Sequence, residues 1–309
     1  KQKVFTAFEL LEKRFDVKTR LLTAFLFLVQ RGLAAGLTIY APAIILSAML
    51  GWNLYYTIIA VGVMVIIYTV SGGSKAVSIT QKWQMTVILL GMVIAFFYII
   101  AGLPEGVGMS EALTIASAGE RLNAINFSFD FSERYTLWSG LTGGLFLALS
   151  YFGTDQSQVQ RYLGGKSVRE SKVGLKFNAI RKIPMQCFIL FMVVMMVVFY
   201  TFQTHPVMFN APAYQKLQTS AMADSLKTLE KAYQVNHEKQ KTAALDLLED
   251  DNIKSRAAFA SYENEGRQLR QTAVQLVRDT DDAKAAKDSD FVFLSFIFGY
   301  LPAGLVGLL

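Results

Sequence analysis

Long apolar runs dominate this amino-acid sequence and restrict what it can fold into. Six of them contain few charged side chains: residues 21–50, 54–71, 83–103, 135–153, 183–202 and 291–309. About 20 helical residues cross a hydrocarbon core about 30 Å thick. No water reaches that depth, so the backbone N–H and C=O groups must be satisfied within each segment, as in a helix. The alternating short strands of a membrane barrel are not seen. The pattern predicts an all-α integral membrane protein, a polytopic helical bundle.

The basic residues between these runs indicate the orientation of the chain. Segment 1–20 has six Lys and Arg, 51–53 none, 72–82 two, 104–134 two and 154–182 seven. Short cytoplasmic loops are enriched in Lys and Arg, so we expect 1–20, 72–82 and 154–182 to be cytoplasmic. Segments 51–53, 104–134 and 203–290 are then external, in a multi-pass protein of the cell (inner) membrane. The net charge of +6 reflects contact with the lipid bilayer, and we expect no nucleic-acid partner.

Residues 216–288 differ from the rest, with 12 basic and 13 acidic residues and no proline. Apolar residues recur there at steps of three and four: Leu226, Leu229 and Tyr233, then Leu269, Ala273 and Leu276. This spacing predicts two or three amphipathic helices, with breaks at Gly266 or at Glu249-Asp250-Asp251. We expect a solvated helical hairpin over 207–290. The alternative is a docking site for an extracytoplasmic partner.

Polar residues inside the apolar runs are candidates for function, because ionisable groups are costly at membrane depth. Arg31 lies 11 residues after Arg20, or about 16 Å along a helix, near the middle of the bilayer. It either binds a substrate carboxylate or hydroxyl, or pairs structurally with a carbonyl or with an acid from helices that lie outside this chain. Residues 151–156, Tyr-Phe-Gly-Thr-Asp-Gln, combine aromatic and hydrogen-bonding side chains where we expect a helix to leave the membrane.

No catalytic or metal-binding pattern is present in the sequence. The two histidines, His205 and His237, are too far apart along the chain to suggest a site, and Cys187 is the only cysteine. Gly72-Gly73 indicates a tight cytoplasmic turn rather than a phosphate loop. Pro184 is expected in the first turn of the fifth span. An enzyme is therefore not predicted.

Three stretches together resemble the sodium:solute symporter family. They are ELLEKRFD at residues 9–16, YTVSGGSKAV at 68–77 and TDQSQVQRYL at 154–163. Each resembles a cytoplasmic segment of that family, and their order agrees with the orientation expected from the basic residues. The resemblance covers most of the chain except the charged insert.

The resemblance implies an inverted repeat of five plus five helices, with solute and ion bound near the midplane. Residues 1–206 would contain core helices three to seven, 207–290 an external insert, and 291–309 the start of core helix eight. We therefore expect an internal fragment of a longer protein. The coupling ion would be Na+, whose main ligands in the family lie on core helices one and eight, mostly outside this chain.

The resemblance also assigns substrate-binding residues one by one. Tyr151 matches a tyrosine that covers the solute in the sugar transporters, and Lys182 matches a sugar-contacting lysine, but Ala148 replaces their sugar-binding asparagine. The carboxylate-binding arginine of sialic acid transporters aligns with Ala34, and Arg31 lies three residues earlier on the same helical face. With Gln156 of the polar segment, the predicted solute contacts are Arg31, Tyr151, Gln156 and Lys182.

Gln81 stands where many members of the family have an aspartate that serves a second ion. A neutral amide cannot supply that charge, so we expect no second coupling ion by this route. The predicted function is sodium-coupled secondary active symport of a small polar organic solute: a sugar, a sugar acid or an amino-acid-like molecule. A membrane sensor that uses the insert is the alternative. A channel is less consistent with the sequence, because polar rings for a pore are not seen.

Overall fold

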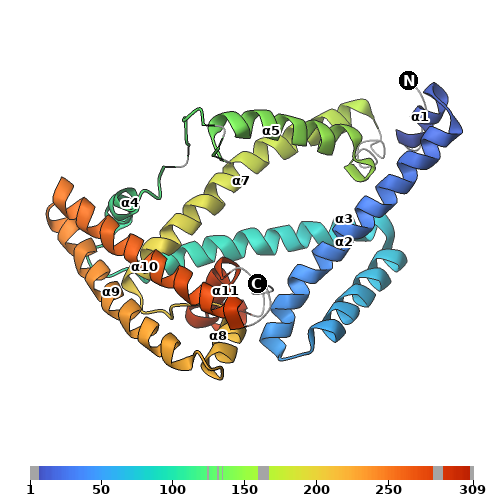
Figure 1. Ribbon diagram of the computed structural model, residues 1–309. Helices are drawn as coiled ribbons and strands as arrows, with labels where there is room; N and C mark the ends of the chain where they lie inside the picture. The colour runs from blue at the N-terminus through green and yellow to red at the C-terminus, as the bar shows by residue number, and fades with distance from the viewer. Residues whose placement is uncertain are drawn as a thin grey trace. The chain divides into compact units, whose positions relative to one another are not determined.

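A computed structural model describes residues 7–123, 125–130, 132–133, 135–158, 167–280 and 288–306. Every regular element among these residues is a helix (Figure 1). The elements are α1 (Ala7–Arg14), α2 (Val17–Leu50), α3 (Leu54–Ala101), α4 (Met109–Ala118), α5 (Leu137–Leu149), η1 (Ser150–Thr154), α7 (Val168–Phe202), α8 (Ala211–Gln218), α9 (Ala223–Glu249), α10 (Ile253–Thr280), α11 (Ser289–Tyr300) and α12 (Ala303–Val306). The all-α prediction is confirmed.

The chain divides into two compact units. The first unit consists of Lys1–Ile66 and Ala124–Cys187, and the second of Ile67–Asn123 and Phe188–Leu309. The division therefore crosses helices α3 and α7, and it groups the segment that precedes Asn123 with the charged insert. The linear division into 1–206, 207–290 and 291–309 stays a prediction.

In the described part of the chain, four helices are long and apolar enough to cross a membrane: Val17–Ser47, Leu54–Gly73, Ala76–Ala101 and Val168–Phe202. They correspond to the spans expected at 21–50, 54–71, 83–103 and 183–202. Large apolar side chains on them, such as Leu21, Phe25 and Ile59, are more than half exposed in the chain by itself. Such surfaces are stable against lipid or other apolar helices, so the chain is a multi-pass membrane protein.

The other two expected spans are interrupted helices. Residues 135–153 form α5, of only 13 residues, followed by one π-helical turn, η1. The run expected over 291–309 forms α11, which ends at Tyr300, and then the short helix α12. Pro302 lies at this break and cannot donate a backbone hydrogen bond to the preceding turn. Periodicity alone did not predict either interruption.

The turn expected at Gly72-Gly73 is confirmed. Gly73 has φ 59° and ψ −167°, a conformation open to glycine but strained for other residues, and it divides α3 into two spans. The expectation for Pro184 was wrong, because α7 begins at Val168 and the proline lies inside the helix. The basic segment before it continues the helix, so Pro184 leaves the carbonyl of Ile180 without its helical N–H donor.

The charged insert is a helical hairpin, as expected (Figure 1). Helices α9 and α10 pack side by side and are joined by Asp250–Asn252, which confirms the break at the acidic run. Asn252 caps α10, because its Oδ1 accepts the backbone N–H of Ser255 at 2.9 Å. The break expected at Gly266 was wrong. This glycine lies within α10, where a β-carbon would approach Asn236 Nδ2 to 3.1 Å, so it allows α9 to pack closely.

An apolar core joins this hairpin to the segment that precedes it. Leu226 and Tyr233 of α9 and Ala273 of α10 are buried, as the spacing predicted, and Leu229, Leu269 and Leu276 pack around them. Val207 and Met208 enter the same core from the end of the α7 segment. Burial of these side chains contributes about 25 cal/mol per Å² of apolar surface, so the hairpin is held against the chain that carries it.

The structure brings together the two histidines that the sequence separates. The His205 and His237 ring centroids lie 5.0 Å apart. His205 Nδ1 lies 2.9 Å from the carbonyl of Gln203 and therefore donates, which leaves Nε2 to accept the Tyr233 hydroxyl at 2.7 Å. His237 Nε2 donates to the carbonyl of Tyr200 at 3.0 Å. The two histidines were expected to share no site because the sequence shows only their separation along the chain.

This buried position should make the stability of the second unit depend on pH. Burial lowers the pKa of His205 to about 4, and the groups that face it are His237, Arg270 and Asp288. Between its unfolded pKa of 6.5 and about 4, the unfolded chain binds a proton that the native chain does not. Stability is therefore lost as the pH falls through this window, by about 2 kcal/mol at pH 5.

We expect His205→Gln, which keeps a hydrogen-bonding side chain but does not titrate, to reduce this loss. Thermal denaturation of the detergent-solubilised full-length protein at pH 7.5 and pH 5 measures it. The difference in melting temperature between the two pH values should be smaller in the variant. Equal differences in the two proteins would contradict the assignment to His205.

Candidate functional site

The candidate site lies where α5 ends, within the first unit. Thr136 caps the start of α5, and its hydroxyl oxygen accepts the backbone N–H of Ser139 at 3.2 Å. At the other end the helix widens into the π turn η1, where the N–H of Asp155 donates to the carbonyl of Ser150 at 3.2 Å. Single π turns in α-helices are frequent at functional sites, because they free backbone groups and redirect side chains. The segment that follows is rich in polar side chains.

Arg31 of α2 contacts two side chains of this segment, those of Asp155 and Ser157. Its guanidinium forms an ion pair with Asp155, with 3.5 Å between Nη1 and Oδ2, and Nη2 donates to Ser157 Oγ at 2.5 Å. The other oxygen of Asp155 accepts the backbone N–H of Ser157 at 2.9 Å and its hydroxyl at 2.6 Å. The arginine is thus paired with an acid of this same chain, whereas the structural alternative had expected that acid on helices outside it.

The aromatic and amide groups of the segment form a second set of contacts. Gln158 Nε2 donates to the Tyr151 hydroxyl at 2.7 Å. Tyr151 also packs edge-on against Phe152, with 5.1 Å between the ring centroids. Gln156 and Gln158 are both buried, while the Tyr151 side chain remains partly exposed. Part of the Tyr151 side chain therefore stays accessible, and the hydrogen bond from Gln158 orients its hydroxyl.

Asp155 and Ser157 contact Arg31 in the middle of the candidate span Val17–Ser47. Arg31 lies about 16 Å beyond Arg20 along α2, and these two residues touch it. The 13 residues of α5 span about 20 Å, less than a hydrocarbon core of about 30 Å. The expectation that this helix leaves the membrane at residues 151–156 stays a prediction. The basic part of 154–182 stays expected in the cytoplasm.

The predicted solute contacts are only partly brought together. Arg31, Tyr151 and Gln156 belong to the same region of the first unit, on or beside the π turn. Lys182 lies on α7 in the first unit and is exposed, and no contact joins it to this cluster among the described residues. Gln81 lies on α3, in the second unit, and is also exposed. Their predicted roles stay predictions.

Asp155, Ser157 and Gln158 complete the cluster; they belong to segments noted in the sequence, but none of them was assigned a role of its own. The signal was present, because Asp155 is an acid next to an apolar run and Arg31 is a base within one. Opposite charges at membrane depth are stable only in pairs, so each could have been sought as the partner of the other. Because Arg31 and Ser157 hold the carboxylate of Asp155, we assign it no sodium ion.

Comparison with known proteins decides the family. The model of the sodium:solute symporter family matches residues 1–233, which is most of the chain. This protein belongs to the sodium:solute symporter family. The family is one of transporters, which agrees with the multi-pass helices and with the absence of a catalytic motif from the sequence. The match ends within α9, so α10 and the helices after it lie outside the matched segment.

Curated relatives agree with the family. The human sodium/iodide cotransporter is 34% identical to this symporter-family chain over 176 residues, and human sodium-coupled monocarboxylate transporter 1 is 38% identical over 177 residues. Bovine sodium-coupled monocarboxylate transporter 2 is 33% identical over 175 residues. Each match covers 57% of this chain and 27–28% of the relative. The chain therefore spans about a quarter of the length of the relatives it matches.

The pairing of Arg31 with Asp155 can be tested by a double-mutant cycle. We expect Arg31→Ala and Asp155→Ala each to lower the melting temperature of the full-length protein in detergent, because each leaves a charge unpaired. The double variant should lose less than the sum of the two, with a coupling of about 1–3 kcal/mol. Strictly additive losses would show that the two side chains act independently.

Proposed function

We propose that this protein is a sodium-coupled symporter that takes up a small polar organic solute by alternating access. The observation that carries the proposal is the helix α5, which opens into a π turn at the depth of the Arg31–Asp155 ion pair. Discontinuous helices of transporters form midplane sites from freed backbone groups and from side chains such as these. Membership of the sodium:solute symporter family supports sodium as the coupling ion.

Among small polar solutes, we propose one that carries a carboxylate or an equivalent negative charge. Iodide and monocarboxylates, which the relatives' names contain, are both anions. The guanidinium of Arg31 presents several N–H donors in a planar fork, and only two of its nitrogens are engaged by Asp155 and Ser157. A solute carboxylate can therefore share Arg31 with Asp155, while Ala148 disfavours a hexose of the kind bound by the sugar transporters.

The other predicted contacts take complementary roles in this proposal. Tyr151 covers the solute, and its hydroxyl is oriented by the buried Gln158. Gln156 supplies an amide close to the π turn, and Lys182 a second cation that approaches once the helices rearrange. Gln81 carries no charge, so coupling proceeds without a second ion at that position.

Sodium entry supplies the free energy for accumulation of the solute. Each charge that moves down a membrane potential of 100 mV contributes about 2.3 kcal/mol. The solute site can change conformation in response to this free energy, because α5 is already interrupted. Rearrangement of the π turn therefore breaks few further backbone hydrogen bonds. We place the protein in the cell (inner) membrane, with the hairpin on the external side.

Uptake into proteoliposomes tests the proposed function. We expect the full-length protein to accumulate a radiolabelled small monocarboxylate when a sodium gradient points inward. Replacement of sodium by potassium should reduce uptake at least about tenfold. If no small anion, sugar or amino acid is moved in either cation although the protein is folded, the carrier proposal fails and a sensor remains.

Substitution of Arg31 tests the assigned solute contact. We expect Arg31→Lys to raise the KM for the carboxylate at least about tenfold, because an ammonium cannot bind Asp155 and a carboxylate together in the planar geometry of Arg. Arg20→Lys is the matched control, since it changes the same residue type on the same helix, in a pair with Glu12 away from the π turn. An unchanged KM in Arg31→Lys would exclude Arg31 as a solute ligand.

A further inference from the structure

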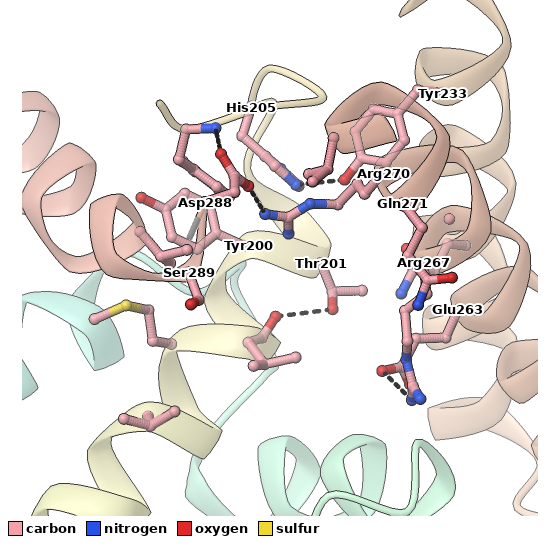
Figure 2. Close-up of a pocket in the computed structure, with 18 of the residues that line it drawn as sticks. Tyr200, Thr201, His205, Tyr233, Glu263, Arg267, Arg270, Gln271, Asp288 and Ser289 are labelled. Atoms are coloured by element: carbon pink, nitrogen blue, oxygen red, sulfur yellow. Dashed lines mark hydrogen bonds and ion pairs between the residues drawn. The ribbon is translucent and has the colours of Figure 1, made fainter. Parts of the chain in front are cut away.

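A second cavity, in the second unit, has the composition of a binding site. It measures about 680 Å³, within the range of sites for small organic ligands. The end of α7, helices α9 and α10, and the start of α11 line it, together with Arg121, His205 and Phe209 (Figure 2). None of the residues at the π turn takes part in it.

Arginine is the characteristic residue of this cavity. Arg121, Arg267, Arg270 and Arg278 line it together with two carboxylates, Glu263 and Asp288, which leaves a formal charge of +2. Glu263, Arg267, Arg270 and Arg278 follow one another on α10 at helical spacing and lie on the face of α10 that lines the cavity. The match to the family model ends before this helix, so the arginines of α10 belong to the part of the chain outside the match.

The two carboxylates are already engaged and fix the arginines in the wall. Glu263 Oε1 accepts Arg121 Nε at 2.8 Å and Arg267 Nη2 at 3.1 Å. Asp288 Oδ2 accepts Arg270 Nη2 at 2.6 Å, and Oδ1 accepts the backbone N–H of Phe209 at 2.7 Å. Figure 2 shows the side chain of Arg270 extending from α10 to Asp288. The acids therefore act as anchors for the guanidinium groups.

The charged surface left for a ligand is provided by guanidinium donors. The carboxylate side chains are 7–8% exposed, whereas those of Arg121, Arg267 and Arg270 are 30–47% exposed. Each guanidinium has more N–H donors than it uses in these pairs. Arg278 is exposed and has no ion pair among the described residues. Arginine in this arrangement binds carboxylates in bidentate geometry.

Apolar and aromatic groups form the rest of the wall. Tyr200, Phe209 and Tyr233 contribute to it, as do valines of α7, α10 and α11. Arg270 also stacks over the Phe209 ring, 4.8 Å from its centroid. This combination suits an organic anion with a flat apolar body better than a bare inorganic ion, because the apolar wall contributes only when apolar ligand surface is buried.

We propose that this cavity is a binding site for an organic anion with an aromatic body and one or two carboxylates, separate from the solute contacts at the π turn. The ligand would contact α10 of the hairpin and the ends of α7 and α11 at the same time. Its binding would therefore stabilise the hairpin against two helices of the transporter. The site lies on the side of the membrane that the basic residues predict to be external.

Isophthalate, a ring with two carboxylates, is the probe for this site. We expect radiolabelled isophthalate to bind the detergent-solubilised full-length protein, and the uncharged isophthalamide not to displace it. The double variant Arg267→Gln/Arg278→Gln should weaken binding at least about tenfold, since it removes two cations and retains the Arg121–Glu263 and Arg270–Asp288 pairs. Arg256→Gln is the matched control, on the same helix but in an exposed pair with Asp251.

The transport site could also bind a carboxylate, so the experiment includes Arg31→Ala. Binding that persists in Arg31→Ala and is lost in Arg267→Gln/Arg278→Gln supports the proposal, whether or not the protein transports anions. Binding that is lost in Arg31→Ala and retained in the double variant assigns the probe to the π turn and overturns it. Absence of binding to the wild-type protein, or equal weakening by Arg256→Gln, also overturns it.

Discussion

The need to satisfy backbone hydrogen bonds without water governs this structure. In the hydrocarbon core an unpaired N–H or C=O group costs several kcal/mol, so the spans are helical, and a break needs other partners nearby. The helix breaks therefore indicate where the backbone needs other hydrogen-bond partners. The helix α5 widens into a π turn beside polar side chains, and α11 ends at a proline. Within the described ranges, the Arg31–Asp155 pair lies next to the first break, and no ion pair lies next to the second.

In both compact units charged side chains are paired with opposite charges, but the pairs have different consequences. In the first unit, Arg31 and Asp155 pair at the depth of the π turn, where a single charge would be unstable. In the second unit, Glu263 and Asp288 are buried by their arginine partners, which keep part of their donors exposed. One pair brings an interrupted helix to a spanning helix. The other set lines a cavity with cations and so prepares it for an anion.

The charged hairpin is part of the second unit rather than a separate appendage. Val207 and Met208 enter its core, and Arg121 joins α10 from a segment that comes much earlier in the chain. Asp288 then links the end of the hairpin to the backbone of Phe209 and Asn210, before α8. The hairpin is consequently closed at its base by a buried carboxylate. A ligand or a protonation event at this base would act on the end of α7 as well.

The sequence by itself determined the helical class, four of the membrane spans, the turn at Gly73 and the hairpin of the insert, because these depend on local composition and period. Hydrocarbon-length apolar runs can be satisfied in few ways, and glycine at positive φ has few substitutes. Arg31 was also recognisable as a residue that needs a partner. The three motifs, read together, were sufficient to suggest the symporter family that the wider comparison showed.

Only the tertiary structure decided which residues meet. Asp155 and Arg31 are far apart along the chain, as are His205 and His237, and Arg121 and Glu263, and no periodicity reports such contacts. The π turn, the interior position of Pro184 and the continuity of α10 through Gly266 were likewise missed. Each depends on what packs against the helix, since close approach of α9 or a polar partner can compensate for a locally unfavourable residue.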